Sequence, residues 1–198
     1  MAVYYETEVG LIFRDKLKIS TDAIEWKGHV IPLEMVTGVR WGSITQVYGY
    51  AVPIHTEYKI AFQSPFYEAK ISLAGKKGKE KYEEITESLW RVLATPLSIR
   101  ILKQLRNGDD IAIGNIKFND NGVFLKKLGL FREEFFTWQE PLEISSNNGS
   151  CIISAKKVKY SASASYIYDN NTHIFDAIVR QFFKNFNPHN PQLSNLLL

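Results

Sequence analysis

The sequence has a single cysteine, Cys151, among its 198 residues. One thiol can form no intrachain disulfide and cannot supply the several thiolates of a structural zinc site. The four histidines stand in four separate segments, without the three or four converging ligands that a metal requires. We therefore expect a fold held together by its core, no metal and no cofactor, and a reducing, cytoplasmic location.

Long apolar runs are also missing. None approaches the ~18 residues that a membrane-spanning helix needs. The N-terminal segment carries Glu6 and Glu8 and has no apolar core of signal-peptide length. We expect a soluble protein that can meet a membrane only from its surface.

No strong charge bias is present. The formal net charge is +3, from 24 Lys and Arg against 21 Asp and Glu. The two signs are interspersed, whereas a protein that neutralises many phosphates usually shows a dense basic face. We expect no specific nucleic-acid partner.

The motifs of the common enzyme classes are absent. There is no Gly-x-Ser-x-Gly and no His-Glu-x-x-His. Acidic doublets such as Glu83-Glu84 are neighbours in sequence, and neighbouring side chains of a strand or helix point apart. Cys151 is followed by Ile152-Ile153 with no histidine nearby, which is typical of a buried small residue. The sequence predicts that the protein is not an enzyme; a deep pocket lined by several titrating side chains would revive that alternative.

What the sequence does contain is a β-rich internal repeat. Aromatic residues make up 13% of the chain and suit half-buried strands. Residues 17–24 (Leu-Lys-Ile-Ser-Thr-Asp-Ala-Ile) match residues 116–123 (Ile-Lys-Phe-Asn-Asp-Asn-Gly-Val) in the order of apolar and polar positions. Each copy predicts a strand, a polar turn and a second strand, with Asp22-Ala23 and Asn121-Gly122 at turns that can need positive φ.

Each half ends in a predicted helix. Residues 79–95 carry apolar side chains at helical spacing, and Thr95-Pro96 predicts the N-cap and first residue of a second helical piece, 97–106. Residues 171–185 form the closing helix of the second half. Gly75-Lys76-Lys77-Gly78-Lys79 is predicted to be the turn before the first helix. It is not a phosphate-binding P-loop, because the spacing of its glycines is too short.

The expected fold class is therefore mainly β (β+α). We predict two tandem modules, each a bent antiparallel sheet or split barrel capped by a C-terminal helix. The first module spans residues 1–107 and includes its closing helix and a short helical linker; the second spans residues 108–186. A C-terminal tail, 187–198, ends in three leucines, which dock on a neighbouring subunit, dock on their own module or fray.

This order of elements resembles the pleckstrin-homology-like superfold, and in particular bacterial proteins that carry two such domains in tandem. The resemblance rests on the repeated strand-turn-strand opening, on Phe135-Phe136-Thr137-Trp138 with an inward Trp138, on the join 105–114 and on the closing helix 172–186. It covers nearly the whole chain except the tail. It implies a binding or scaffolding role, sometimes with oligomerisation, and no catalytic residues. The Arg-x-Arg element of phosphoinositide-binding members is absent.

We predict a non-catalytic protein-interaction or self-assembly module, because two modules offer open sheet edges that can recruit a strand from a partner. The alternative is a peripheral binder of anionic membrane lipid through basic loops. The candidate contact residues lie in two stretches: Lys76, Lys77 and Lys79, and Lys126, Lys127, Phe131 and Arg132.

Overall fold

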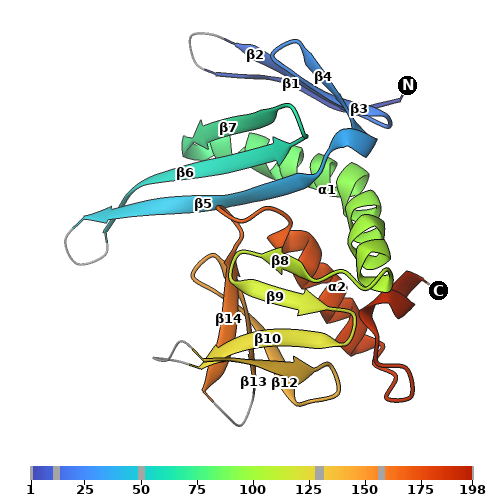
Figure 1. The fold of residues 1–198 in the computed structure, drawn as a ribbon. Helices are drawn as coiled ribbons and strands as arrows, with labels where there is room; N and C mark the ends of the chain where they lie inside the picture. The colour runs from blue at the N-terminus through green and yellow to red at the C-terminus, as the bar shows by residue number, and fades with distance from the viewer. Residues whose placement is uncertain (1, 11–13, 49–51, 128–131, 156–158, 198) are drawn as a thin grey trace. The chain divides into compact units, whose positions relative to one another are not determined.

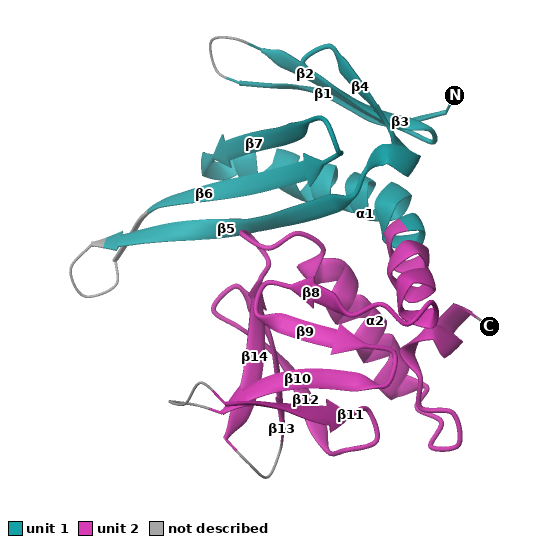
Figure 2. Cartoon of the chain, in the orientation of Figure 1, with its two compact units in different colours: residues 1–96 teal, residues 97–198 magenta. Residues whose placement is uncertain are grey.

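The computed structural model describes residues 2–10, 14–48, 52–127, 132–155 and 159–197 (Figure 1). The described part of the chain is mainly β, as the sequence predicts, and it contains antiparallel sheets and two α-helices. It divides into two compact units, residues 1–96 (unit 1) and 97–198 (unit 2) (Figure 2). None of the helices in the described part of the chain is long and apolar enough to cross a membrane.

Unit 1 contains two antiparallel sheets. The first has four strands in sequential order, β1 (Val3–Val9), β2 (Asp15–Ser20), β3 (Ala23–Trp26) and β4 (His29–Pro32). After a short 3-10 turn, Leu33–Met35, the second sheet has three strands, β5 (Gly38–Tyr48), β6 (Val52–Gln63) and β7 (Glu68–Ala74). Strand β7 alternates strictly between exposed and buried residues, so one face of its sheet forms part of the core.

Helix α1 (Gly75–Arg106) follows β7 directly and contacts both sheets of unit 1. Trp90 meets Trp41 of β5 edge to face, with ring centroids 6.2 Å apart. On the other sheet, Tyr5 of β1 donates a hydrogen bond to Glu84 at 2.7 Å. Ile85, Leu89 and Leu93, one helical turn apart, are buried. The amphipathic stripe predicted from the sequence therefore forms the helical side of the core.

The predictions for the two ends of this first helix were wrong. Gly75–Lys79 is the first turn of α1 and not a loop, and Pro96 lies inside one continuous helix instead of starting a new one. A proline in a helix interior costs about 3 kcal/mol. Buried Val92 and Leu93 before Pro96, and Leu97 and Ile101 after it, each stabilise the helix by about 1.5–3 kcal/mol. Continuous burial on both sides thus outweighs the proline.

Unit 2 repeats this order of elements. Four strands form an antiparallel meander, β8 (Ile111–Ile113), β9 (Ile116–Asn119), β10 (Gly122–Lys127) and β11 (Glu133–Thr137). Three more follow, β12 (Leu142–Asn147), β13 (Ser150–Ala155) and β14 (Tyr160–Ser165), and then helix α2 (Thr172–Lys184). Pairing of β14 with the end of β10 joins both groups into one seven-stranded sheet.

The turns differ from the prediction. Positive φ occurs at Lys27 and Gly28 between β3 and β4, and not at Asp22-Ala23 or Asn121-Gly122. Gly122 is required for a different reason: a Cβ at this position would lie 2.2 Å from the carbonyl oxygen of Phe136 on β11. The glycine lets β10 and β11 approach closely where β10 begins.

The core of unit 2 lies between its sheet and α2. Trp138 is 1% exposed, as the predicted inward orientation requires, and its indole N–H donates to the carbonyl of Asn119 at 3.2 Å. Phe175 of α2 packs on Phe118 of β9 with ring centroids 4.7 Å apart. These aromatic contacts fix α2 against the strands.

The C-terminal tail docks on unit 2. Ser194, in a short 3-10 turn (Leu193–Leu197), donates from its backbone N–H and its hydroxyl to the two carboxylate oxygens of Asp120, at 2.7 and 2.8 Å. Leu193 beside it is completely buried, and Arg106 donates to the carbonyl of Ser194 at 3.0 Å. Of the alternatives for the tail, docking on its own module is observed, at Leu193 and Ser194.

Candidate functional site

An open groove runs along one side of unit 2, between strand β12 and helix α2. Its volume is about 510 Å³. Leu142, Glu143 and Ile144 line it from β12, and Arg180 and Phe183 line it from α2. Leu142 and Ile144 stand on the same face of the strand, and with the ring of Phe183 they form the apolar part of the lining, while Glu143 and Arg180 form a charged part.

Strand β12 forms one edge of the sheet. It pairs with β13 over its whole length, from Leu142↔Ala155 to Asn147↔Ser150, and with no other strand in the described part of the chain. An edge strand carries backbone N–H and C=O groups directed away from its neighbour, which can accept an additional strand. The groove therefore combines an apolar lining with a hydrogen-bonding edge.

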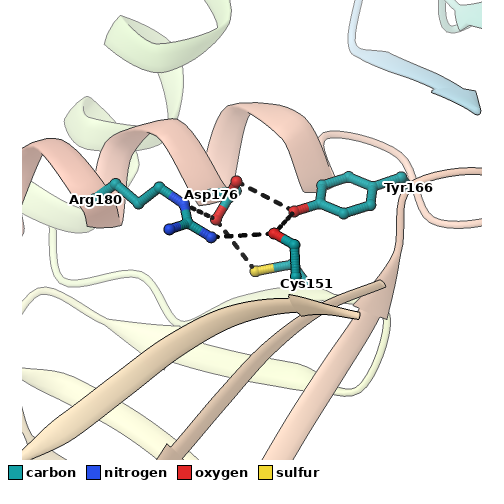
Figure 3. Close-up of polar contacts among 5 residues, drawn as sticks. Cys151, Tyr166, Asp176 and Arg180 are labelled. Atoms are coloured by element: carbon teal, nitrogen blue, oxygen red, sulfur yellow. Dashed lines mark hydrogen bonds and ion pairs between the residues drawn. The ribbon is translucent and has the colours of Figure 1, made fainter. Parts of the chain in front are cut away.

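A polar cluster connects α2 to the end of β12 and the start of β13, next to the turn that joins the two strands (Figure 3). Asp176 of α2 lies at its centre. One carboxylate oxygen accepts a hydrogen bond from Arg180 at 2.7 Å and one from the Cys151 thiol at 3.6 Å; the other accepts from the hydroxyl of Tyr166 at 3.1 Å. Ser146 of β12 closes the cluster, 2.9 Å from the Tyr166 hydroxyl and 3.1 Å from a guanidinium nitrogen of Arg180.

This cluster is not arranged for nucleophilic catalysis. Burial, aided by the negative charge of Asp176, raises the pKa of the Cys151 thiol to about 12. Burial also raises the pKa of Tyr166 to about 12. Both groups are therefore protonated at neutral pH and act as hydrogen-bond donors to Asp176, whereas a catalytic cysteine needs a lowered pKa. The cluster is a polar anchor that holds the helical side of the groove.

The described residues offer no metal site: nowhere among them do three or more His, Cys, Asp or Glu side chains converge. Within the same residues, every buried side-chain nitrogen or oxygen has a hydrogen-bond partner.

The basic residues singled out in the sequence lie apart from this groove. Lys126 and Lys127 are exposed at the end of β10, and Arg132, just before β11, forms an ion pair with Glu134 at 2.8 Å. Phe131 falls outside the described residues. Lys126, Lys127 and Arg132 do not line the groove of unit 2.

The lysines of the first stretch lie in the opening turns of α1. Lys76 and Lys79 are exposed, and Lys79 is 3.6 Å from Glu83. Lys77 differs from them because it lines a second cleft, of about 640 Å³, within unit 1. Arg14, His55 and Lys81 contribute to the same cleft from other parts of the chain.

The residues of the β12–α2 groove were not identified from the sequence. Asp176 and Arg180 stand four residues apart on the polar side of the predicted closing helix, a spacing that indicates an ion pair. Their partners Ser146 and Cys151 are 34 and 25 residues away from Arg180 and Asp176, respectively. The i,i+4 spacing was the only local signal of the cluster.

Comparison with known proteins gives no further assignment: the chain matches no protein-family model, no curated protein and no solved structure.

Proposed function

We propose that the protein is a non-catalytic interaction module that binds an extended segment of a partner chain along β12. The bound segment adds a strand to the sheet edge and places alternate side chains in the groove against α2. The observation that carries this proposal is the coincidence of an unpaired edge with an adjacent groove lined by Leu142, Ile144 and Phe183. Backbone hydrogen bonds supply affinity in this mode, and the side-chain pockets supply specificity.

The chemistry of the groove defines the partner segment. The apolar part of its lining, Leu142, Ile144 and Phe183, favours apolar side chains at every second position of an extended chain. Arg180 lies at the helical side of the groove, 47% exposed in its side chain. Two of its nitrogens are held by Asp176 and Ser146. The third, Nη1, has no partner among the described residues, so an acidic residue next to the apolar positions finds a donor there.

The order of elements supports the same class of function. Each unit has four antiparallel strands, then three, then a helix. We interpret each unit as a pleckstrin-homology-like module, as the sequence resemblance implies, and modules of that kind bind or scaffold. The edge of β12 is also available to a second copy of the chain, so self-assembly is the other form of the same interaction.

The test uses the full chain as bait for phage-displayed random linear peptides, followed by affinity measurements on the enriched sequences. We expect peptides with alternating apolar residues. Ile144→Asp should weaken their binding at least about tenfold, because it puts a charge in the apolar lining. Val30→Asp is the control, since Val30 is 62% exposed on β4 in unit 1.

Equal affinity of the enriched peptides for the wild type and for Ile144→Asp contradicts the assignment to this groove. If no peptide is enriched, light scattering of the wild type and of Ile144→Asp tests whether the β12 edge binds a second copy of the chain. A dimer lost on substitution supports it, and a monomer in both cases rejects both forms.

A further inference from the structure

The cleft of unit 1 has a volume of about 640 Å³, within the roughly 300–1,000 Å³ of small-molecule sites. It lies where the end of β1 and the residue before β2 meet strands β6 and β7 and the first two turns of α1. Four basic and two acidic side chains line it: Arg14, His55, Lys77 and Lys81, and Glu8 and Glu57. The charged part of the lining is therefore mostly basic.

The start of α1 carries charges that an isolated helix disfavours. Lys76, Lys77, Lys79 and Lys81 lie in its first two turns, and the first turn has no acidic residue. The N-terminus is the positive end of the helix dipole, where carboxylates are favourable and lysines are not. Lys77 and Lys81 are also four residues apart, so two like charges share one side of the helix. An anion bound beside them would offset both unfavourable effects.

Gly78 brings the backbone of this first turn to the cleft. It is buried and lines the cleft, and a Cβ at this position would lie 3.2 Å from the backbone carbonyl carbon of Leu73 on β7. A residue without a side chain thus lets the helix begin close against the strand. The first N–H groups of a helix have no acceptor within it and favour a bound anion. The positive end of α1 therefore borders the cleft together with its two lysines.

Both carboxylates of the cleft already have a cationic partner. Glu8 forms an ion pair with Arg14 at 3.3 Å, and Glu57 forms one with Lys59 at 3.3 Å. Arg14 uses its Nη1 for this contact, and a guanidinium has five N–H donors in all. The two carboxylates thus leave the charge of Lys77 and Lys81 uncompensated.

The two lysines supply donors for a ligand. Lys77 is exposed, and it forms no hydrogen bond or ion pair with another of the described residues. Lys81 donates to the backbone carbonyl of Glu8, and an ammonium group has three N–H donors. A phosphate group has three strong acceptor oxygens, which is one for each of Lys77, Lys81 and Arg14.

We propose that the cleft of unit 1 binds a small ligand through a phosphate monoester group, with Arg14, Lys77 and Lys81 as its donors. A phosphate monoester suits this site better than a carboxylate does, because it carries the larger negative charge and more acceptors. The same group occurs on soluble phosphate esters and on the headgroups of some lipids, and the experiment distinguishes these two sources. This site in unit 1 is independent of peptide binding at β12 in unit 2.

The experiment is an NMR titration of the isotope-labelled full chain with inorganic phosphate, in which sodium chloride keeps the ionic strength constant. We expect saturable shifts of the backbone amides of Lys77, Gly78 and Lys81, and no shifts of that size in unit 2. Lys77→Gln should weaken phosphate binding at least about fivefold, because it removes a charge-assisted hydrogen bond.

Lys76→Gln is the matched control. It removes the same charge from the same turn of α1, but Lys76 does not line the cleft. Its phosphate affinity should stay within about twofold of the wild type, since salt screens a charge outside the site. Both substitutions should raise the urea midpoint of the phosphate-free protein, because each removes a cation from the positive end of a helix. Unfolding would therefore not explain a loss of binding in Lys77→Gln.

A second arm identifies the source of the phosphate group. It is co-sedimentation with phosphatidylcholine vesicles that contain or lack phosphatidic acid, whose headgroup is a phosphate monoester. Binding that requires phosphatidic acid and decreases in Lys77→Gln assigns the site to a lipid headgroup. Phosphate binding without vesicle binding assigns it to a soluble phosphate ester.

Two results of the titration would overturn the proposal. One is the absence of saturable shifts at the start of α1, or equal phosphate affinity of the wild type and Lys77→Gln. The other is an equal loss of affinity in Lys76→Gln and Lys77→Gln. That result would show diffuse attraction to the lysines as a group in place of binding in the cleft.

Discussion

Arg180 lies one turn after Asp176 on α2 and donates from Nε to its Oδ1 at 2.7 Å. The Asp176 side chain is only 19% exposed, and it also accepts hydrogen bonds from Cys151 and Tyr166. One carboxylate thus connects the helix to strand β13 and to the turn that follows β14. The groove beside β12 depends on this connection, because Arg180 lines it.

Asp176→Asn should destabilise the protein by about 1–3 kcal/mol. The substitution keeps the size of the side chain but removes the charge that Arg180, Cys151 and Tyr166 share, and hydrogen bonds to charged groups contribute about that much. Urea unfolding followed by circular dichroism measures the change. Glu87→Gln is the control: Glu87 also forms an i,i+4 pair, with Arg91, but is 73% exposed, so its loss should cost less than about 0.5 kcal/mol. Equal effects of both variants would show that the cluster contributes no more than a surface pair.

The thiol of Cys151 should be unreactive in the folded protein. Its pKa is raised to about 12 by burial and by Asp176, so at pH 8 almost none of it is thiolate. We expect iodoacetamide to modify it at least about tenfold more slowly than in urea-unfolded protein, where the thiol has its ordinary pKa. A native rate equal to the unfolded rate would contradict the buried position.

The same group makes stability depend on pH in the alkaline range. Because the folded state holds the proton more tightly, its contribution is complete below the ordinary pKa of 9.0 and is lost as the pH rises toward about 12. Tyr5, Tyr82 and Tyr166, whose pKa values burial raises to about 12, act with the same sign above pH 10. The urea midpoint should therefore fall between pH 9 and 12, and Cys151→Ser should reduce the fall between pH 9 and 10. A urea midpoint that stays constant up to pH 11 would contradict the raised pKa values of Cys151 and the three tyrosines.

The strands and helices could be predicted because their signals are local. Alternation in β7 and the helical stripe of α2, which buries Ile174, Phe175 and Ile178, follow directly from the period of each element. The order within each half, a run of strands followed by a helix, was predicted for the same reason, whereas its division into four strands and three strands was not. The prediction of a turn at Gly75–Lys79 was wrong because it relied on the two glycines of this segment, which favour a loop. There, Gly78 serves the close approach of α1 to Leu73 of β7, which only the tertiary structure reveals.

The candidate sites could not be predicted, because they join residues distant in sequence. The cleft of unit 1 brings Lys77 of α1 together with His55 of β6 and with Arg14, which precedes β2. The lysine was singled out from its local cluster, but its neighbours Lys76 and Lys79 do not line that cleft. A run of lysines in the sequence shows where positive charge is dense. Which of these lysines lines the cleft depends on how the helix packs on β7, and this is not visible in the sequence.

Docking of the tail should contribute measurably to stability. Asp120 accepts two hydrogen bonds from Ser194, and both residues are buried. Ser194→Ala removes one donor and should cost about 1–2 kcal/mol, and Asp120→Ala should cost more because it leaves both donors of Ser194 without an acceptor. Urea unfolding of both variants and the double variant gives the coupling energy, which we expect to be at least about 0.5 kcal/mol. If the two substitutions change the free energy of unfolding additively, Ser194 and Asp120 do not interact in the protein in solution.

Gly122→Ala should be among the more damaging small substitutions in unit 2. The added Cβ would lie 2.2 Å from the Phe136 carbonyl oxygen and 2.6 Å from the Phe135 ring, and the nearer atom belongs to the backbone of the paired strand β11, which cannot rotate away. Forcing the two strands apart should cost about 1–3 kcal/mol, as overpacking of a well-packed site typically does. Gly149→Ala provides the comparison: no atom lies within 4 Å of its Cβ position, but its φ of +73° is strained for alanine by about 1 kcal/mol. Thermal and urea unfolding of the two variants distinguish steric conflict from backbone strain. A smaller loss for Gly122→Ala than for Gly149→Ala would mean that β10 and β11 separate at low cost where β10 begins.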